Sequence, residues 1–494
     1  MEFSPSWNSL SQHPVAKWLR EGKFGIYTHW GVYSVPACGP NVSWYPCFMY
    51  RPGTQQYSYH CRNYGNPDKF GYKDFIPMLT GERFDPDEWA ELFAAAGARF
   101  AGPVAEHHDG FSMWKSDINE WNSYNMGPRR DVAGELAKAI RAKGMKFMAA
   151  LHHAEQWYFY PHWIKEFDTA DPGYQGLYGA AHNTEWASMR TDDPNWQAPE
   201  GMDVWASQNK PSFSFLDTWL AKGMEVVDKL SPDLIWFDFG LGFVPESYKQ
   251  QLIAYYYNQA IARGQDPVVT YKFDNLPVNC GLIDIELGRY DKLKNMPWLT
   301  DTTVDDGEAW GYMKNAEYKS PRTVVHYLID NVSKNGFLLL NIGPDPTGWI
   351  PDEAKEILSG IGNWLAVNGE AIYGTVPWSV YGAGPTQLEK SGYFNESKTP
   401  VYTSGDVRFT VKDNALYAVF LGWPEKEAVI EKMPESFRPE EVTSLSMLGS
   451  EEKIDWKMEG SRLMMSCPKS KPCNYAFTYK IERRFYSYRG SQSP

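Results

Sequence analysis

The stretch PDLIWFDFG, residues 232–240, places one carboxylate, Asp238, at the end of a short apolar and aromatic run. A proline and a glycine bracket the run, as turn residues bracket a strand. An ionised side chain is costly in such surroundings unless a partner or a function needs it. We therefore expect Asp238 to end a buried strand and to project into the mouth of a site.

Similar runs recur along the first three quarters of the chain, separated by helical patterns. One of these patterns, DVAGELAKAIRAKG at 131–144, places Val132, Leu136, Ala139 and Ile140 on one face. Strands alternating with helices indicate a parallel sheet. Seven candidate strands fit an α/β fold of the (β/α)8-like barrel type better than an open doubly wound sheet: 23–30, 99–108, 146–153, 233–238, 267–272, 282–286 and 337–343.

The texture changes near residue 378. From there on, short alternating segments are separated by glycine, proline and aspartate, which is typical of an antiparallel β-sandwich. We expect a catalytic barrel over residues 1–375 and a C-terminal β-sandwich domain over 376–494.

Composition excludes several classes of protein. The formal charge of −13 argues against a nucleic-acid surface. No apolar stretch of 18 residues occurs, so we expect no membrane span. The N-terminal residues lack the pattern of a signal peptide, so localisation stays open: secreted or periplasmic if a signal was trimmed, otherwise cytoplasmic. The six cysteines have no zinc spacing; free thiols are favoured over a Cys467–Cys473 bridge.

Histidines and charged residues gather where the predicted strands end. In a barrel of this kind, reactive groups lie at the carboxyl ends of strands. Adjacent histidines on a strand point to opposite faces, so each pair offers at most one inward ligand. We therefore expect no metal and interpret the inward imidazoles as hydrogen-bond partners for hydroxyl groups. The polar strand ends include His29, His107, His108, His152, His153, Lys272 and Glu286.

Two carboxylates, Asp238 and Glu286, end strands 48 residues apart. Glycosidic cleavage needs such a pair facing one pocket, because one group attacks the anomeric carbon and the other protonates the leaving oxygen. The alternatives are structural: Asp238 as a buried salt-bridge partner, and Glu286 as a partner for Arg289 or Lys272.

Several motifs resemble the α-L-fucosidases of glycoside hydrolase family 29, and the resemblance covers nearly the whole chain in the right order. The most specific are HWG, HHDGF and LLLNIGP. They stand within KFGIYTHWGVYSVPA (23–37), EHHDGFSMWKS (106–116), PDLIWFDFG (232–240), SKNGFLLLNIGPDPTG (333–348) and NWLAVNGEAIYGTVPW (363–378).

The resemblance implies a retaining exo-α-L-fucosidase that needs no cofactor and acts on terminal fucosyl groups of glycans. It places the nucleophile on Asp238. Glu286 is our choice of acid/base, with Glu308 and Asp301, from the loop that follows residue 298, as alternatives. The sugar-binding positions that it implies are His29, Trp44, His107, His108 and Trp236, with His153 and Trp157 lining the same pocket.

Two positions depart from the family pattern. Ser43 stands where members often have glutamate, and Lys272 where arginine is frequent, so a bidentate fork becomes a point charge. A roomier subsite near Ser43 would accept a substituted fucose, such as a sulfated one, or α-L-galactose. Alternatively, another carboxylate, Glu106 or Glu155, fills the role of the missing glutamate.

A further alternative is a non-catalytic carbohydrate-binding protein, against which the retention of both carboxylates speaks. Linkage preference, the leaving-group sugar and the oligomeric state stay open. The Tyr- and Asn-rich stretch at 49–75 is the candidate for contacts with the leaving group.

Overall fold

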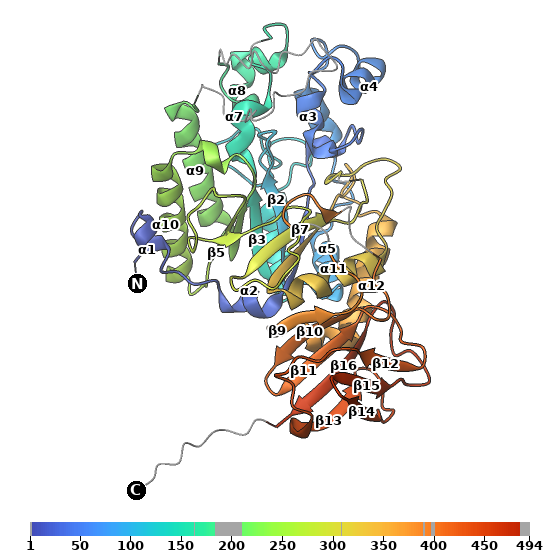
Figure 1. Cartoon of the computed structure of the whole chain (residues 1–494). Helices are drawn as coiled ribbons and strands as arrows, with labels where there is room; N and C mark the ends of the chain where they lie inside the picture. The colour runs from blue at the N-terminus through green and yellow to red at the C-terminus, as the bar shows by residue number, and fades with distance from the viewer. Residues whose placement is uncertain are drawn as a thin grey trace.

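The computed structural model describes residues 2–162, 164–182, 210–307, 309–388, 391–396 and 401–484. Its larger part is a barrel of eight parallel strands, in the order β6-β5-β4-β3-β2-β1-β8-β7 (Figure 1). A parallel bridge between Asp284, just after β6, and Leu299 of β7 nearly closes the ring. The strands are β1 Phe24–Thr28, β2 Phe100–Glu106, β3 Lys146–Leu151, β4 Leu234–Phe237, β5 Val268–Tyr271, β6 Leu282–Ile283, β7 Trp298–Thr303 and β8 Gly336–Ile342.

Strand β7 is the one that the sequence pattern did not predict. Its segment WLTDTT is polar on both faces, yet all six residues are buried. The polar side chains find partners inside the barrel: Lys272 Nζ lies 2.9 Å from Asp301 Oδ1, and Thr300 Oγ1 donates to the Ile285 carbonyl at 2.7 Å. The interpretation of Asp301 as a loop residue is therefore wrong.

Amphipathic helices cover the outside of the barrel. Helix α6 (Val132–Ala142) shows why they form: the Asp131 side chain accepts a hydrogen bond from the Gly134 amide, and the apolar face predicted from the sequence is buried. The other long helices of the wall are α5 Pro86–Ala95, α9 Phe213–Leu230, α10 Glu246–Ala262, α11 Pro321–Ser333 and α12 Asp352–Asn368.

Six shorter helices complete the barrel part of the chain within the described residues. Helices α1 Trp7–Leu10 and α2 Lys17–Gly22 precede the first strand. The loops that follow the strands carry α3 Tyr45–Phe48, α4 Gln55–Asn63, α7 Gln156–Phe159 and α8 Gln175–Tyr178. Figure 1 shows α3, α4, α7 and α8 together, at the opposite end from the C-terminal sheets.

The C-terminal strands form two antiparallel sheets that share one apolar core, which confirms the predicted sandwich. The larger sheet has the order β13-β16-β11-β10-β9 and the smaller one β12-β15-β14. Their bounds are β9 Val376–Ala383, β10 Val407–Lys412, β11 Ala415–Phe420, β12 Glu427–Ile430, β13 Val442–Met447, β14 Trp456–Glu459, β15 Arg462–Ser466 and β16 Phe477–Arg483.

Helices α11 and α12 join the sandwich to the barrel (Figure 1). Arg408 of β10 pairs with Asp330 of α11 at 2.6 Å, both fully or nearly fully buried, and Trp364 Nε1 of α12 donates to the Ala476 carbonyl at 2.9 Å. The segment between β9 and β10 returns to the barrel, where Gly392 bridges to Arg289. All six cysteines are free thiols, as the sequence favoured.

None of the helices that the structure describes is both long and apolar enough to cross a membrane.

Candidate active site

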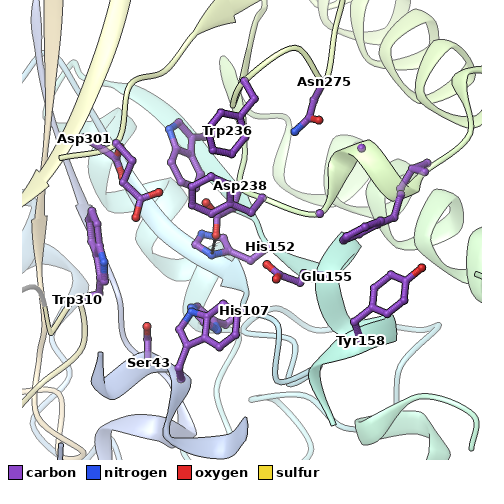
Figure 2. A pocket seen from close by; sticks show the side chains of 18 of the residues that line it. Ser43, His107, His152, Glu155, Tyr158, Trp236, Asp238, Asn275, Asp301 and Trp310 are labelled. Carbon is purple, nitrogen blue, oxygen red and sulfur yellow. Dashed lines mark ion pairs between the residues drawn. The ribbon is translucent and has the colours of Figure 1, made fainter. Parts of the chain in front are cut away.

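A cavity of about 1020 Å³ opens where the barrel strands end (Figure 2). Residues at or just after the ends of seven strands line it, so the site is built by the barrel itself. They are His29 after β1, His107 after β2, His152 after β3, Asp238 after β4, Phe273 after β5, Glu286 after β6 and Asp301 in β7.

Asp238 is the first residue after β4 and is 7% exposed. His152 Nδ1 lies 3.0 Å from Asp238 Oδ2, and His108 Nε2 lies 3.4 Å from the same oxygen; Figure 2 marks the first contact. Burial alone would raise the pKa of Asp238, but the two imidazoles and Lys272 outweigh it and hold the pKa well below the usual range. The structure therefore keeps this buried carboxylate ionised.

His108 differs from the other histidines of the cluster because its pKa is raised. Its Nδ1–H donates to the carbonyl of His152 at 2.8 Å, so Nε2 faces carboxylates of both Asp238 and Glu155, each at 3.4 Å. Burial would lower the pKa of His108, but the two carboxylates outweigh it and raise the pKa. An imidazolium here places positive charge beside Asp238.

His29 and His107 are the neutral members. Burial holds the pKa of both side chains well below the usual range. His29 Nδ1 lies 2.8 Å from Asn341 Oδ1, whose amide nitrogen donates elsewhere, so His29 carries its proton on Nδ1 and Nε2 is an acceptor. Both residues line the cavity, where such groups can bind hydroxyls.

Lys272, fully buried behind the cavity, lies against three carboxyl groups. Its Nζ is 2.8 Å from Asp284, 2.9 Å from Glu286 and 2.9 Å from Asp301. Burial raises the pKa of Glu286 well above its usual range; Lys272 opposes this shift, while Asp301 and Asp238 reinforce it. One ammonium cannot balance three carboxylates, and burial and Asp301 raise the pKa of Asp284 well above its usual range too, so protonation is favoured within this cluster.

The structure brings most of the predicted sugar-binding residues together. Its cavity is lined by His29, Ser43, Trp44, His107 and Trp236, while His108 and Lys272 lie behind the lining and contact its carboxyl groups. Among the described lining residues, only one histidine of each adjacent pair is present, His107 and His152, as the sequence analysis expected; His108 contacts Asp238 from behind the lining.

His153 and Trp157 are placed elsewhere. Among the described residues that line the cavity, neither is present. Strand β3 ends at Leu151, and His153 turns outward, where its Nε2 lies 3.2 Å from the Trp219 carbonyl and its ring stacks on Trp219. Trp157 stacks on His182, with ring centroids 4.0 Å apart. Glu308, an alternative acid/base, lies outside the described residues.

Of the two carboxylates that could replace the glutamate absent at position 43, only Glu155 lines the cavity. Glu106 is fully buried and is held by Lys222 Nζ at 2.7 Å. Glu155 is 2% exposed, and burial raises its pKa to about 7, although His108 lowers it and Asp238 raises it further. Figure 2 shows its carboxyl group between Asp238 and Tyr158.

Several lining residues escaped the sequence analysis. Tyr27 alternates with His29 along β1, a signal that was available, and its hydroxyl donates to Asp301 at 2.9 Å. Trp310 and Asn275 stand in loops with no periodic signal. Within the described residues of the lining, the stretch 49–75 contributes none, so its prediction as the contact region for the leaving group is not supported.

Two groups of described side chains have spacings that can hold a metal ion: His29 with His107 and His152, and His108 with His152 and Asp238. Both groups share His152, and a metal ion in the second group would bind the Asp238 carboxylate. The arrangement is equally that of a hydroxyl-binding cluster, so the expectation that the reaction needs no metal stays a prediction.

Comparison with known proteins decides what this site belongs to. A family model described as "Alpha-L-fucosidase" matches residues 1–370, and a model of the "Alpha-L-fucosidase C-terminal domain" matches residues 402–482. The chain belongs to the alpha-L-fucosidase family. The expected glycoside hydrolase with fucosidase activity is thereby confirmed.

Proteins named as fucosidases match over more than nine tenths of their length. Tissue alpha-L-fucosidase of Rattus norvegicus is 32% identical over 97% of this chain and 93% of its own, and the Homo sapiens enzyme is 31% identical over 97% and 91%. Thermotoga maritima alpha-fucosidase, solved in complex with a mechanism-based inhibitor, has a TM-score of 0.77 and 29% identity, covering 98% of this chain and all of its own. Its complex with fucose has a TM-score of 0.75.

Proposed function

We propose that this fucosidase removes terminal α-L-fucosyl groups from glycans with retention of configuration, with Asp238 as nucleophile and Glu286 as acid/base. The observation that carries the proposal is the opposite ionisation of two carboxyl groups lining one cavity. The pKa of Asp238 is held well below the usual range and that of Glu286 well above it. When the pKa values of two neighbouring acids are displaced in opposite directions, the acid with the raised pKa is assigned as proton donor and the ionised one as nucleophile.

In the first step, the Asp238 carboxylate attacks the anomeric carbon. Both imidazole contacts are made to Oδ2, so we expect Oδ1 to form the new bond. The bond from the anomeric carbon to the glycosidic oxygen breaks, and Glu286 gives that oxygen its proton. The products are a fucosyl ester of Asp238, a Glu286 carboxylate and the free leaving-group alcohol.

In the second step, the Glu286 carboxylate takes a proton from water as the water oxygen attacks the anomeric carbon. The ester bond to Asp238 breaks, and Asp238 leaves as the carboxylate that His108 and His152 stabilise. Lys272 faces Glu286 at 2.9 Å in both steps and favours the ionised form that the second step needs.

Sugar hydroxyls have neutral and charged partners around Asp238. His29 and His107 offer imidazole nitrogens, and Trp44 and Trp236 offer ring faces. Glu155 supplies a carboxyl group that Ser43 does not. This carboxyl group lies near Trp44, because His108 contacts both Trp44 and Glu155. This arrangement favours plain fucose over the substituted sugars that a roomier subsite would admit.

Proton NMR of early hydrolysis tests the reaction class. The wild type is mixed with an aryl α-L-fucoside, and the first anomer released is followed before mutarotation. Two inversions give α-L-fucose first, whereas a single displacement by water gives β-L-fucose first. Early β-L-fucose would contradict the double displacement, and release of no fucose at all would contradict the activity itself.

A further inference from the structure

Three phenylalanine rings come together at the rim of the cavity from distant parts of the chain. Phe239 follows β4, Phe273 follows β5, and Phe394 lies between β9 and β10. The ring centroids of Phe239 and Phe273 are 5.2 Å apart, and those of Phe239 and Phe394 are 6.2 Å apart in a stacked arrangement. Phe273 is 46% exposed and Phe394 is 53% exposed, so two large apolar side chains face solvent at the site's entrance.

The backbone holds these two exposed rings in an unfavourable conformation. Phe273 has φ 52° and Phe394 has φ 51°, the left-handed region that bulky residues rarely adopt. Both side chains remain about half exposed in this conformation. Strain of this kind, kept at the edge of a site, points to a role in binding.

The rings stand on the acid/base side of the cavity. The Phe394 amide donates to the Glu286 carbonyl at 2.9 Å, and the Phe239 ring lies 5.3 Å from Lys272 Nζ, which contacts Glu286. The Phe273 amide donates to the Tyr393 hydroxyl at 2.7 Å, which ties the β5 loop to the segment that carries Phe394. In the proposed mechanism, the leaving group departs from the side that Glu286 occupies.

We propose that Phe239, Phe273 and Phe394 form a platform that binds the sugar ring to which fucose is attached. The inference rests on the proposed function. A pyranose ring offers a flat face of C–H groups that packs on aromatic rings, with hydroxyls at its edge. Asp274 and Asn275, which follow Phe273 in the lining, supply polar groups beside the rings. The C-terminal part of the chain thereby contributes Phe394 to substrate selection.

Paired substrates test the platform. α-L-Fucosyl fluoride has a single atom as its leaving group and cannot occupy the platform, whereas a fucosyl disaccharide can. For the double variant Phe273→Ala/Phe394→Ala, kcat/KM on the disaccharide that the wild type cleaves fastest is expected to fall at least tenfold further than kcat/KM on the fluoride. The variants Phe273→Trp and Phe394→Trp keep flat rings and are expected to hold the wild-type ratio within about threefold.

The matched control is Tyr124→Ala, which removes an aromatic ring of similar exposure (44%) that does not line the cavity. Equal losses on both substrates in the double variant would overturn the platform, as would a wild type that cleaves the fluoride but no disaccharide. If the wild type sediments as a dimer and the double variant as a monomer, with an unchanged ratio of kcat/KM on the two substrates, the rings would instead belong to an interface between copies of the chain. A wild type inactive on both substrates would refute the proposed function.

Discussion

The ammonium group of Lys272 lies 2.9 Å from Oε2 of Glu286, yet the Glu286 carboxyl group has a raised pKa. An isolated ion pair at this distance would lower the pKa. Burial outweighs the ammonium, and Asp301 and Asp238 reinforce the upward shift; Asp284 and Asp301 also contact the same ammonium, at 2.8 and 2.9 Å. Lys272 is therefore a counterion shared by three carboxyl groups, which opposes the raised pKa of Glu286 without overcoming it and favours the ionised form that the proposed second step needs.

The pH dependence of kcat/KM follows from the two pKa shifts. Activity needs Asp238 ionised, so it is lost as pH falls through a pKa held well below 3.8; it needs Glu286 protonated, so it is lost as pH rises through a pKa held well above 4.5. Glutamine cannot lose a proton, so we expect Glu286→Gln to lack the alkaline limb that the wild type shows on an aryl α-L-fucoside, whose leaving oxygen Glu286 protonates in the proposed mechanism. An unchanged alkaline limb in this variant would assign that limb to another group.

Removal of the Lys272 charge is expected to be severe. Lys272→Met leaves Asp284, Glu286 and Asp301 without their cation. Breaking a buried ion pair in this way is expected to lower the free energy of unfolding by about 3–5 kcal/mol. Urea unfolding at pH 7 measures the loss. The matched variant Lys272→Arg keeps the charge and is expected to recover most of the stability. Equal stability of Lys272→Met and wild type would contradict the shared-counterion description.

Glu155 makes stability depend on pH. Its pKa is about 7 in the folded protein against a usual value of 4.5, so the stability that this group contributes is fully present below pH 4.5 and is lost as pH rises through about 7. Glu155→Gln removes this dependence. The free energy of unfolding of this variant, relative to that of the wild type, is expected to rise by about 2–3 kcal/mol from pH 4.5 to pH 8. Exposed Glu425→Gln is the control. Parallel stability curves for Glu155→Gln and wild type would refute the assignment.

Chelation tests the histidine clusters. Because the proposed mechanism uses His29, His107 and His152 as hydrogen-bond partners, dialysis against EDTA is expected to leave kcat unchanged. Excess Zn²⁺ is expected to inhibit, since the ligand atoms of these three residues lie within 4.8 Å of one another. Activity lost on dialysis and restored by a divalent metal would show a metal-dependent reaction instead.

Strand periodicity predicted the parts of the site that lie on regular strands. The argument that Asp238 ends a buried strand placed it at the cavity, where it is the first residue after β4. Alternation could not say where a strand stops, and His153, which the family resemblance placed in the pocket, turns away two residues beyond the end of β3. It also missed β7, because Thr300 and Asp301 are polar residues buried by partners from other strands.

Long-range contacts were beyond reach for a different reason. Phe239, Phe273 and Phe394 carry no common pattern, and only the closed barrel with its returning C-terminal segment brings their rings together. The resemblance to a family indicated Asp238 as the nucleophile, and the departure at Ser43 raised Glu106 and Glu155 as substitutes, but only the structure shows that Glu155 lies against His108.

The most direct test of the central claim is covalent trapping of the nucleophile. The wild type is incubated with 2-deoxy-2-fluoro-α-L-fucosyl fluoride, in which the 2-fluorine slows turnover of the intermediate, and the digested protein is analysed by tandem mass spectrometry. We expect one added fluorofucosyl group on the peptide that contains Asp238, and no label in Asp238→Ala. A label on any residue other than Asp238, or labelling that survives in Asp238→Ala, would contradict the assignment.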